Sequence, residues 1–170
     1  MNGEHDDYSE NQGATQPIME ISHLQRREIQ APIAACLIRG FSQVMGHVKA
    51  LEVATAAIQA DAMVVGQSLA ERYGSNTLVE LARIVREVWA EGDAITIHVL
   101  EETARKLSFN VTRCRYAELY ERLGMKDLGF CLSCSRDEAF AKGINPQLEL
   151  LRTQTIMQGA PFCDFHFTLK

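Results

Sequence analysis

Apolar residues recur every three or four positions along the first third of the chain. The set is Ile33, Leu37, Phe41, Val44, Val48 and Leu51. This period is typical of one face of an α-helix, so the pattern predicts an apolar stripe on a helix. Cys36 lies on the apolar side of this helix and is expected to pack there. Gly40 and Gly46 predict a break between two helices.

The helical period continues to Tyr73, where Gly74 predicts a C-terminal stop. Ser75 or Asn76 can cap a third helix, which ends at the Glu-Gly-Asp run of residues 91–93. The positions expected to point inward are Leu78, Leu81, Val85 and Val88. The N-terminal half is therefore predicted to consist of three helices.

The pattern then changes to strict alternation, which is typical of half-buried strands. AITIHVLEE (94–102) and LSFNVTRC (107–114) predict an antiparallel hairpin, and QLELLRTQTIM (147–157) and FCDFHFTL (162–169) predict a second one. Helical segments ending at Gly124 and Gly143 lie between the hairpins. The sequence thus predicts an α+β fold, with N-terminal helices packed on an antiparallel sheet of about four strands and a helical insert between the hairpins.

The composition is that of one globular domain. The chain has 170 residues, of which 46% are hydrophobic and 23% charged, enough for a core without disulfide or metal support. Residues 1–22 are rich in acidic and small polar residues and predict a disordered tail. Residues 23–170 are then a single domain.

Charge and hydropathy exclude several classes of protein. The net charge is −5 and no Lys/Arg cluster occurs, which argues against a nucleic-acid partner. The apolar runs are short or interrupted, so no membrane partner is expected. The N-terminus lacks a basic and then apolar leader, which predicts a cytoplasmic protein whose five cysteines are thiols. The expected partner is a small-molecule substrate, and formation of a homo-oligomer is compatible with the sequence.

Cys131 and Cys134 form a CxxC pair, a spacing that occurs in zinc sites, in redox pairs and in ordinary helix packing. Zinc sites of this type need a second pair or spaced histidines, and a redox pair needs a strand before the helix start. On a helix, Cys131, Cys134 and Asp137 share one face. Cys134 beside Asp137 can therefore act as a nucleophile with a proton carrier. The alternative, which spacing alone favours, is that both thiols pack as small hydrophobes.

The last third of the chain holds further candidates. Strand alternation places Cys163 on an apolar face, at the core or a pocket wall, and Asp164 and His166 on the opposite face. Cys114 ends a strand next to charged neighbours. The polar run RTQT (152–155) is unusual for a central strand and suggests a pocket wall.

Several arginines lie among these polar residues, including Arg115, Arg136 and Arg152. A guanidinium fork suits a substrate carboxylate. The alternative is surface ion pairing with Glu118, Asp137 and Glu149.

Five segments carry a resemblance to a known family: RREIQAPIAACLIRGF, LARIVREVWAEG, LSFNVTRCRYAELYERLG, LGFCLSCSRDEAFAKGINP and RTQTIMQGAPFCDFHF. From about residue 26 onward, the chain resembles the L-2-amino-thiazoline-4-carboxylic acid hydrolase family in order and spacing. The resemblance implies a hydrolase that opens a cyclic amidine at a carbon–nitrogen bond to give a carbamoyl-cysteine. It also implies that Cys114, Cys134 and Cys163 are the motif cysteines, whereas Cys131 is not, and that His166 stands where the family commonly has arginine.

The chain is also distantly similar to four-vinyl-reductase-type small-molecule-binding domains. This similarity implies an alternative function as a non-catalytic sensor or accessory domain. Some such domains bind zinc through cysteines near their end, but the segment before Cys163 has no further cysteine, histidine or acid to support that site.

Two routes fit the ring opening. In the first, Cys134 attacks, Asp137 or Glu118 transfers protons, and an arginine holds the carboxylate. In the second, water attacks after activation by a carboxylate or by a metal. No cofactor is required by the sequence; zinc or another divalent metal, if bound, would be held by Cys114, Cys134 and Cys163. The predicted substrate-binding residues are Arg115, Arg136, Arg152, Thr153, Gln154 and Cys163.

Overall fold

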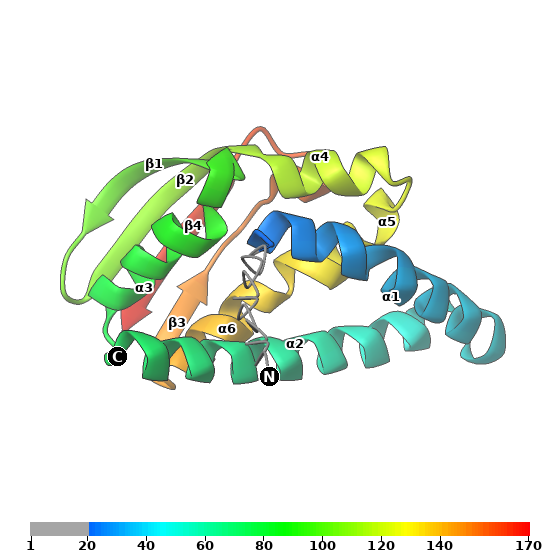
Figure 1. Ribbon diagram of the computed structural model, residues 1–170, viewed down its shortest axis with the longest axis horizontal. Coiled ribbons are helices and arrows are strands. Elements are labelled where there is room, and N and C mark those ends of the chain that lie inside the picture. Colours follow the sequence, from blue (N-terminus) through cyan, green and yellow to red (C-terminus); the bar gives the residue numbers. More distant parts are fainter. Residues whose placement is uncertain (1–20) are drawn as a thin grey trace, which may run out of the picture.

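The computed structural model describes residues 21–170, so nearly all of the disordered tail predicted for residues 1–22 lies outside the described residues. Two long helices, α1 (His23–Met45) and α2 (His47–Tyr73), run antiparallel as a hairpin (Figure 1). A capping box begins α1, because Ser22 Oγ accepts from the backbone N–H of Gln25 and the Gln25 side chain accepts from that of Ser22. The break lies at Gly46 (φ 84°), whereas Gly40 lies inside α1.

The apolar stripe predicted on α1 faces outward, contrary to the expectation that Cys36 packs on its side. Leu37 is 54% exposed and Cys36 is exposed as well, whereas Ile38 is only 5% exposed. The buried face of α1 is formed by Ala31, Ala35 and Ile38. Both faces follow the same helical period, so periodicity could not decide between them. The small residues take the inner face because they let the helix approach its neighbours closely.

The third helical region is longer than one regular helix. Thr77 caps α3 (Leu78–Ile84) by accepting from the backbone N–H of Glu80, in place of the predicted Ser75 or Asn76. The chain continues into a π-helical turn, η1 (Val85–Trp89), and a short 3₁₀ turn, η2 (Glu91–Asp93). Within residues 21–170, no helix has the combination of length and apolar character that a membrane crossing requires.

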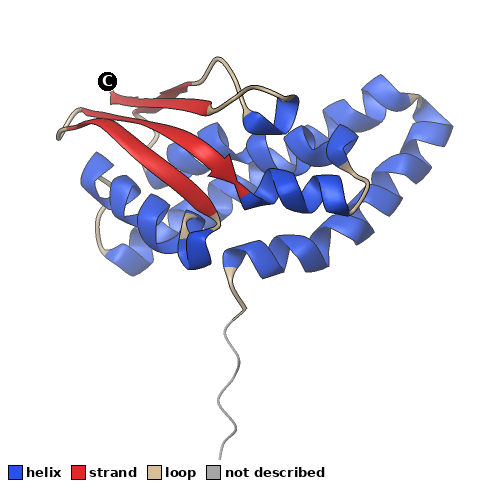
Figure 2. Cartoon of the chain, turned by 90° about the horizontal axis from the view of Figure 1, so that it is seen from above, coloured by secondary structure: helices blue, strands red, loops and turns tan. Residues whose placement is uncertain are grey.

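The α+β prediction is confirmed. Four antiparallel strands, β1 (Ile95–Glu102), β2 (Lys106–Cys114), β3 (Leu148–Leu151) and β4 (Cys163–Leu169), form one sheet in the order β1-β2-β4-β3. Figure 2 shows this sheet on one side of the helices. The insert between β2 and β3 comprises α4 (Arg115–Arg122), α5 (Lys126–Gly129), a second π-helical turn η3 (Phe130–Cys134) and α6 (Arg136–Ile144).

The inner face of the sheet is aromatic. Residues Leu107, Phe109 and Val111 of β2 and Cys163, Phe165 and Phe167 of β4 are buried, as the alternation predicts. The rings of Phe109 and Phe165 stack with centroids 4.9 Å apart. These side chains form the buried, apolar face of the sheet.

Strand β3 ends at Leu151, well before the predicted end at residue 157. The backbone N–H groups of Thr153 and Gln154 donate to the Asp164 carboxylate at 3.0 and 2.8 Å instead of to a neighbouring strand. The polar run therefore leaves the sheet and leads into a 3₁₀ turn, η4 (Ile156–Gln158).

Helices α2 and α6 pack closely against each other at two glycines. A Cβ atom on Gly66 would lie 2.2 Å from the Phe140 carbonyl oxygen, and one on Gly143 would lie 2.2 Å from the Met63 carbonyl oxygen. Gly143, predicted as a helix stop, lies inside α6 and is required for this approach. The contact fixes α6 on α2.

The outward position of the stripe can be tested with two neighbouring residues. We expect Ile38→Ala to lower the free energy of unfolding by about 2–4 kcal/mol, because it leaves a cavity. Leu37→Ala is expected to change it by less than about 0.5 kcal/mol, because that side chain is already in water. Denaturant unfolding measures both, and the opposite ranking would mean that the stripe faces inward.

Candidate functional site

A cavity of about 920 Å³ lies between the helical layer and the sheet. Its walls come from the first turns of α1, the C-terminal half of α2, η1, the β2 and β4 strands, η3 and α6. Six of the residues predicted as site residues line it: Cys114, Cys134, Arg136, Asp137, Arg152 and Cys163. Segments up to 49 positions apart, from Cys114 to Cys163, thus meet at one place.

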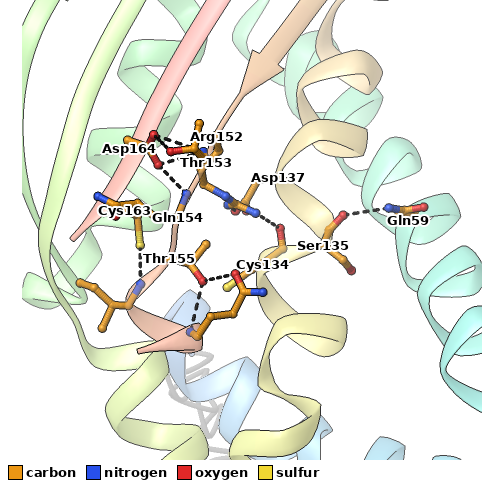
Figure 3. A network of polar contacts seen from close by, with 12 residues as sticks. Gln59, Cys134, Ser135, Asp137, Arg152, Thr153, Gln154, Thr155, Cys163 and Asp164 are labelled. Atoms are coloured by element: carbon orange, nitrogen blue, oxygen red, sulfur yellow. Dashed lines mark hydrogen bonds and ion pairs between the residues drawn. The ribbon is translucent and has the colours of Figure 1, made fainter. Parts of the chain in front are cut away.

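An ion pair joins two of these residues at the floor of the cavity (Figure 3). Arg152 Nη1 donates to Asp137 Oδ2, and Arg152 Nη2 donates to the Cys134 carbonyl oxygen at 2.9 Å. The two charged side chains are only 10% and 19% exposed. The guanidinium also lies 5.0 Å from the centroid of the Phe165 ring, a cation–π contact. Arg152 is therefore held by protein groups on three sides.

The π-helical turn η3 separates the two cysteines of the CxxC pair. Its backbone bond runs from the Ser135 N–H to the Phe130 carbonyl oxygen at 2.8 Å, five residues back. Cys131 is buried on the side of α2, where its sulfur accepts from Thr55 Oγ1 at 3.2 Å. Cys134 lines the cavity instead. The pair therefore does not act as one unit.

Burial controls the protonation of the cavity thiols. Burial raises the pKa of Cys114 to about 11. Burial, and next to it the negative charge of Asp137, raises the pKa of Cys134 well above its usual value. Burial also raises the pKa of Cys163, whose sulfur accepts from the Ile156 N–H at 3.2 Å. At neutral pH all three groups are protonated thiols.

The pKa of Asp137 is raised, although an ion pair with an arginine ordinarily lowers the pKa of a carboxyl group. Burial raises its pKa, and the positive charge of Arg152 only partly offsets this shift. A carboxyl group whose pKa approaches the working pH is better suited to exchange protons with a reactant. Both Asp137 and Cys134 line the cavity, so the carboxyl group with the raised pKa shares it with a thiol.

The other predicted site residues are not brought into the cavity. Glu118 forms a surface ion pair with Arg113 at 2.8 Å, and both side chains are more than half exposed. Arg115 donates to the Gly92 carbonyl oxygen at 2.6 Å. Thr153 and Gln154 hold Asp164, as described above. Their proximity in sequence to cavity residues does not translate into proximity in space.

Two further predicted positions have structural partners. Arg136 lines the cavity but its Nη2 pairs with Asp61 Oδ2 of α2 at 2.7 Å. His166 contacts Ser108 Oγ of the neighbouring strand through Nδ1 at 3.1 Å. His166 does not line the cavity, so the departure from the family's arginine lies away from its walls.

A hydrogen-bonded chain that the sequence did not reveal forms one cavity wall. Arg27 Nη2 lies 3.2 Å from His23 Nε2, His23 Nδ1 lies 2.8 Å from the Tyr116 hydroxyl, and that hydroxyl donates to the Trp89 carbonyl oxygen at 3.2 Å. These partners assign the imidazole proton to Nδ1. Burial first, and then the positive charge of Arg27, lowers the pKa of His23 to about 3, so the ring is neutral. In the sequence, only the four-residue spacing between His23 and Arg27 points to this chain of contacts.

The cavity does not fit the metal site considered from the sequence. Within residues 21–170, no group of three or more histidine, cysteine, aspartate or glutamate side chains is arranged to hold a metal ion.

A family model described as L-2-amino-thiazoline-4-carboxylic acid hydrolase matches residues 26–167. The chain belongs to this family. The resemblance seen in the sequence is thereby confirmed over most of the chain, including every cavity residue named above except His23. The family is named for a hydrolase, which supports a hydrolase reading of the site.

Other comparisons add little to the family assignment. No curated protein matches the chain. Among solved structures, the chain is similar to trafficking protein particle complex subunit 3 from Naegleria fowleri covalently bound to palmitic acid, with 12% identity over 86% of this chain and 96% of that one. The TM-score between the two structures is 0.47.

The raised thiol pKa values predict selective alkylation. At pH 7.5 we expect iodoacetamide to modify the exposed Cys36 at least about 10-fold faster than Cys114 or Cys134, because only thiolates react and these two thiols are protonated and partly buried. The rate at Cys114 should rise with pH up to about 11. Peptide mass spectrometry measures each site. Rapid modification of Cys134 in the folded protein at pH 7.5 would contradict the assignment.

Proposed function

We propose that the protein hydrolyses a small cyclic amidine bearing a carboxylate, such as L-2-amino-thiazoline-4-carboxylate, at a carbon–nitrogen bond. Membership of the hydrolase family supports the reaction class. The observation that carries the proposal is the meeting of Cys134, Asp137 and Arg152 in one cavity. These residues supply a nucleophile, a proton carrier and a fixed positive charge.

In the proposed mechanism, Asp137 is the general base. As the Cys134 sulfur attacks the carbon between the ring nitrogen and ring sulfur, the Cys134 proton passes to Asp137. The substrate reacts as its protonated amidinium, whose ring nitrogen already carries one hydrogen. Asp137 gives the proton taken from Cys134 to this nitrogen, which leaves as a primary amine while the exocyclic nitrogen forms a double bond to the carbon. Water then adds to that carbon and gives one proton to Asp137, which passes it to the departing Cys134 sulfur. The second water proton goes to the freed amine, the water oxygen becomes the carbonyl oxygen, and the exocyclic nitrogen remains as the carbamoyl amide. One water molecule is consumed overall, and a carbamoyl-cysteine is released.

The protonated resting thiol is compatible with this mechanism. A buried thiol is a weak nucleophile until a neighbouring base removes its proton during attack. The raised pKa of Asp137 brings that carboxyl group closer to neutral pH and makes it a stronger base than an ordinary aspartate. Arg152 keeps the carboxylate oriented toward the cavity floor.

A binding function without catalysis is the second candidate. It is favoured by the size of the cavity, about 920 Å³, which exceeds the needs of a single five-membered ring, and by the absence of a ready thiolate among Cys114, Cys134 and Cys163. Tight binding of a small molecule with no product at high enzyme concentration would support this candidate over the hydrolase.

The two cysteines of the CxxC pair give a matched test of the mechanism. With L-2-amino-thiazoline-4-carboxylate, we expect mass spectrometry to detect a product heavier by one water molecule. Cys134→Ser should lower kcat by at least about 10³-fold, because it removes the nucleophile. Cys131→Ser, which alters a thiol outside the cavity, should retain most of the activity. If Cys134→Ser keeps activity, Cys134 is not the nucleophile and Asp137 acts on water instead.

The pH profile tests Asp137 separately. Because Asp137 must be ionised to accept a proton, we expect kcat/KM to fall as the pH drops through its pKa, which lies above the usual aspartate value. Asp137→Asn should abolish this acidic limb together with most of the activity. An acidic limb unchanged in the residual activity of Asp137→Asn would assign the titration to another group.

A further inference from the structure

The cavity is lined by more arginine side chains than acidic side chains, so their charges do not balance. Its arginines are Arg26, Arg27, Arg72, Arg136 and Arg152, and its acids are Glu87, Glu91 and Asp137. Arg136 and Arg152 have protein acids, and Glu87 is engaged by Arg83 at 2.8 Å. Across residues 21–170, the ion pairs include none to the remaining three arginines. The cavity therefore has an excess of positive charge.

Arg27 is the arginine for which this excess matters most. It lies in the cavity wall, and burial together with the positive charge of Arg136 lowers its pKa. Its hydrogen-bond partners are neutral acceptors, Gln30 Oε1 at 3.2 Å and His23 Nε2 at 3.2 Å. A partly buried cation without a counter-charge is destabilising, and an anion that binds to it offsets this cost.

The surroundings of Arg27 also hold it in place. His23 bonds to Arg27 on one side and to Tyr116 on the other, and Tyr116 is anchored on the Trp89 carbonyl oxygen. The His23 and Tyr116 rings pack edge to face with centroids 5.7 Å apart. A guanidinium fixed in this way loses little freedom when a ligand binds.

The arginines predicted from the sequence are less suited to this role. Arg152 uses Nη1 and Nη2 for Asp137 and the Cys134 carbonyl oxygen. Arg136 pairs with Asp61, and Arg115 lies outside the cavity walls. Arg27 was not among the predicted residues. Of the three cavity arginines without an ion pair within residues 21–170, Arg26 and Arg72 are exposed and only Arg27 is partly buried.

We propose that Arg27 binds the carboxylate of the ligand, with the ring directed toward Cys134 and Asp137. Arg27, Cys134 and Asp137 line the same cavity, so a ligand held by Arg27 can present its ring to the other two residues. The ligand class is a small heterocycle with a single carboxylate. The identity of the ring rests on the proposed function, whereas the recognition of the carboxylate does not.

The protein contains its own reporter for this site. Trp89 is the single tryptophan of the chain and lines the cavity, so its fluorescence reports binding there. L-2-amino-thiazoline-4-carboxylate and the corresponding carboxamide are titrated into the wild-type protein, Arg27→Gln and Arg27→Lys. Arg39→Gln is the matched control, because it removes the same charge from the same helix at a position outside the cavity.

We expect Arg27→Gln to weaken binding of the carboxylate by about 10- to 100-fold, as for loss of a charged hydrogen bond. Binding of the carboxamide should change by less than about 3-fold. Arg27→Lys should fall between the wild type and Arg27→Gln, because it keeps the charge but loses the fork. Arg39→Gln should bind both ligands like the wild type.

Several results would overturn the proposal. One is that the wild type and Arg27→Gln bind the carboxylate with equal affinity. Another is that Arg27→Gln loses affinity for the carboxylate and the carboxamide by the same factor. A third is that the fluorescence of the wild type responds to neither ligand. If Arg27→Gln fails to fold, Arg27→Lys decides by the same comparison. If carboxylate binding depends on Arg27 but no turnover occurs, the proposed hydrolysis is wrong and the role of Arg27 stands. If turnover occurs with the same KM in the wild type and Arg27→Gln, the hydrolysis stands and the role of Arg27 is wrong.

Discussion

Helices α2 and α6 touch backbone to backbone, and a methyl group on Gly66 or Gly143 would lie 2.2 Å from a carbonyl oxygen of the other helix. This contact determines where the first turn of α6 lies, and that turn carries Arg136 and Asp137. From there Asp61 on α2 can reach Arg136, and Arg152 from beyond β3 can reach Asp137. The positions of the cavity-floor side chains therefore depend on Gly66 and Gly143, which have no side chains and let the two helices touch.

Low solvent access then sets the charge state of the cavity. It keeps the Cys134 thiol and the His23 imidazole neutral, while Asp137 is shifted toward its neutral form. Arginines stay charged under the same conditions, because a guanidinium does not lose its proton in a protein. The result is a cavity whose neutral groups can gain or lose protons and whose fixed charge is positive. Such a cavity suits an anionic substrate whose reaction requires proton transfer.

Much of the fold was predictable because each strand and helix has its own period, and the buried positions of β2 and β4 follow alternation. The period of α1 could not show which of two apolar faces is buried. For the site, the family resemblance identified Cys114, Cys134 and Cys163, which do line one cavity. Sequence proximity suggested Glu118, which lies on the surface. It missed Arg27, which is linked through His23 to Tyr116 of a helix far along the chain. Long-range contacts of this kind leave no local pattern.

The π-helical turn η3 has a consequence for comparing relatives of this protein. Each residue in a helix turns the chain by about 100°, so the extra residue of this turn determines the direction in which Cys134 points. Loss of one residue between Phe130 and Ser135 would restore a regular helix and rotate the thiol relative to Asp137, even though every motif residue remained. The number of residues in this short segment therefore matters for the site as much as the identity of the motif residues. An alignment that preserves the cysteine but changes the length of the turn does not preserve the site.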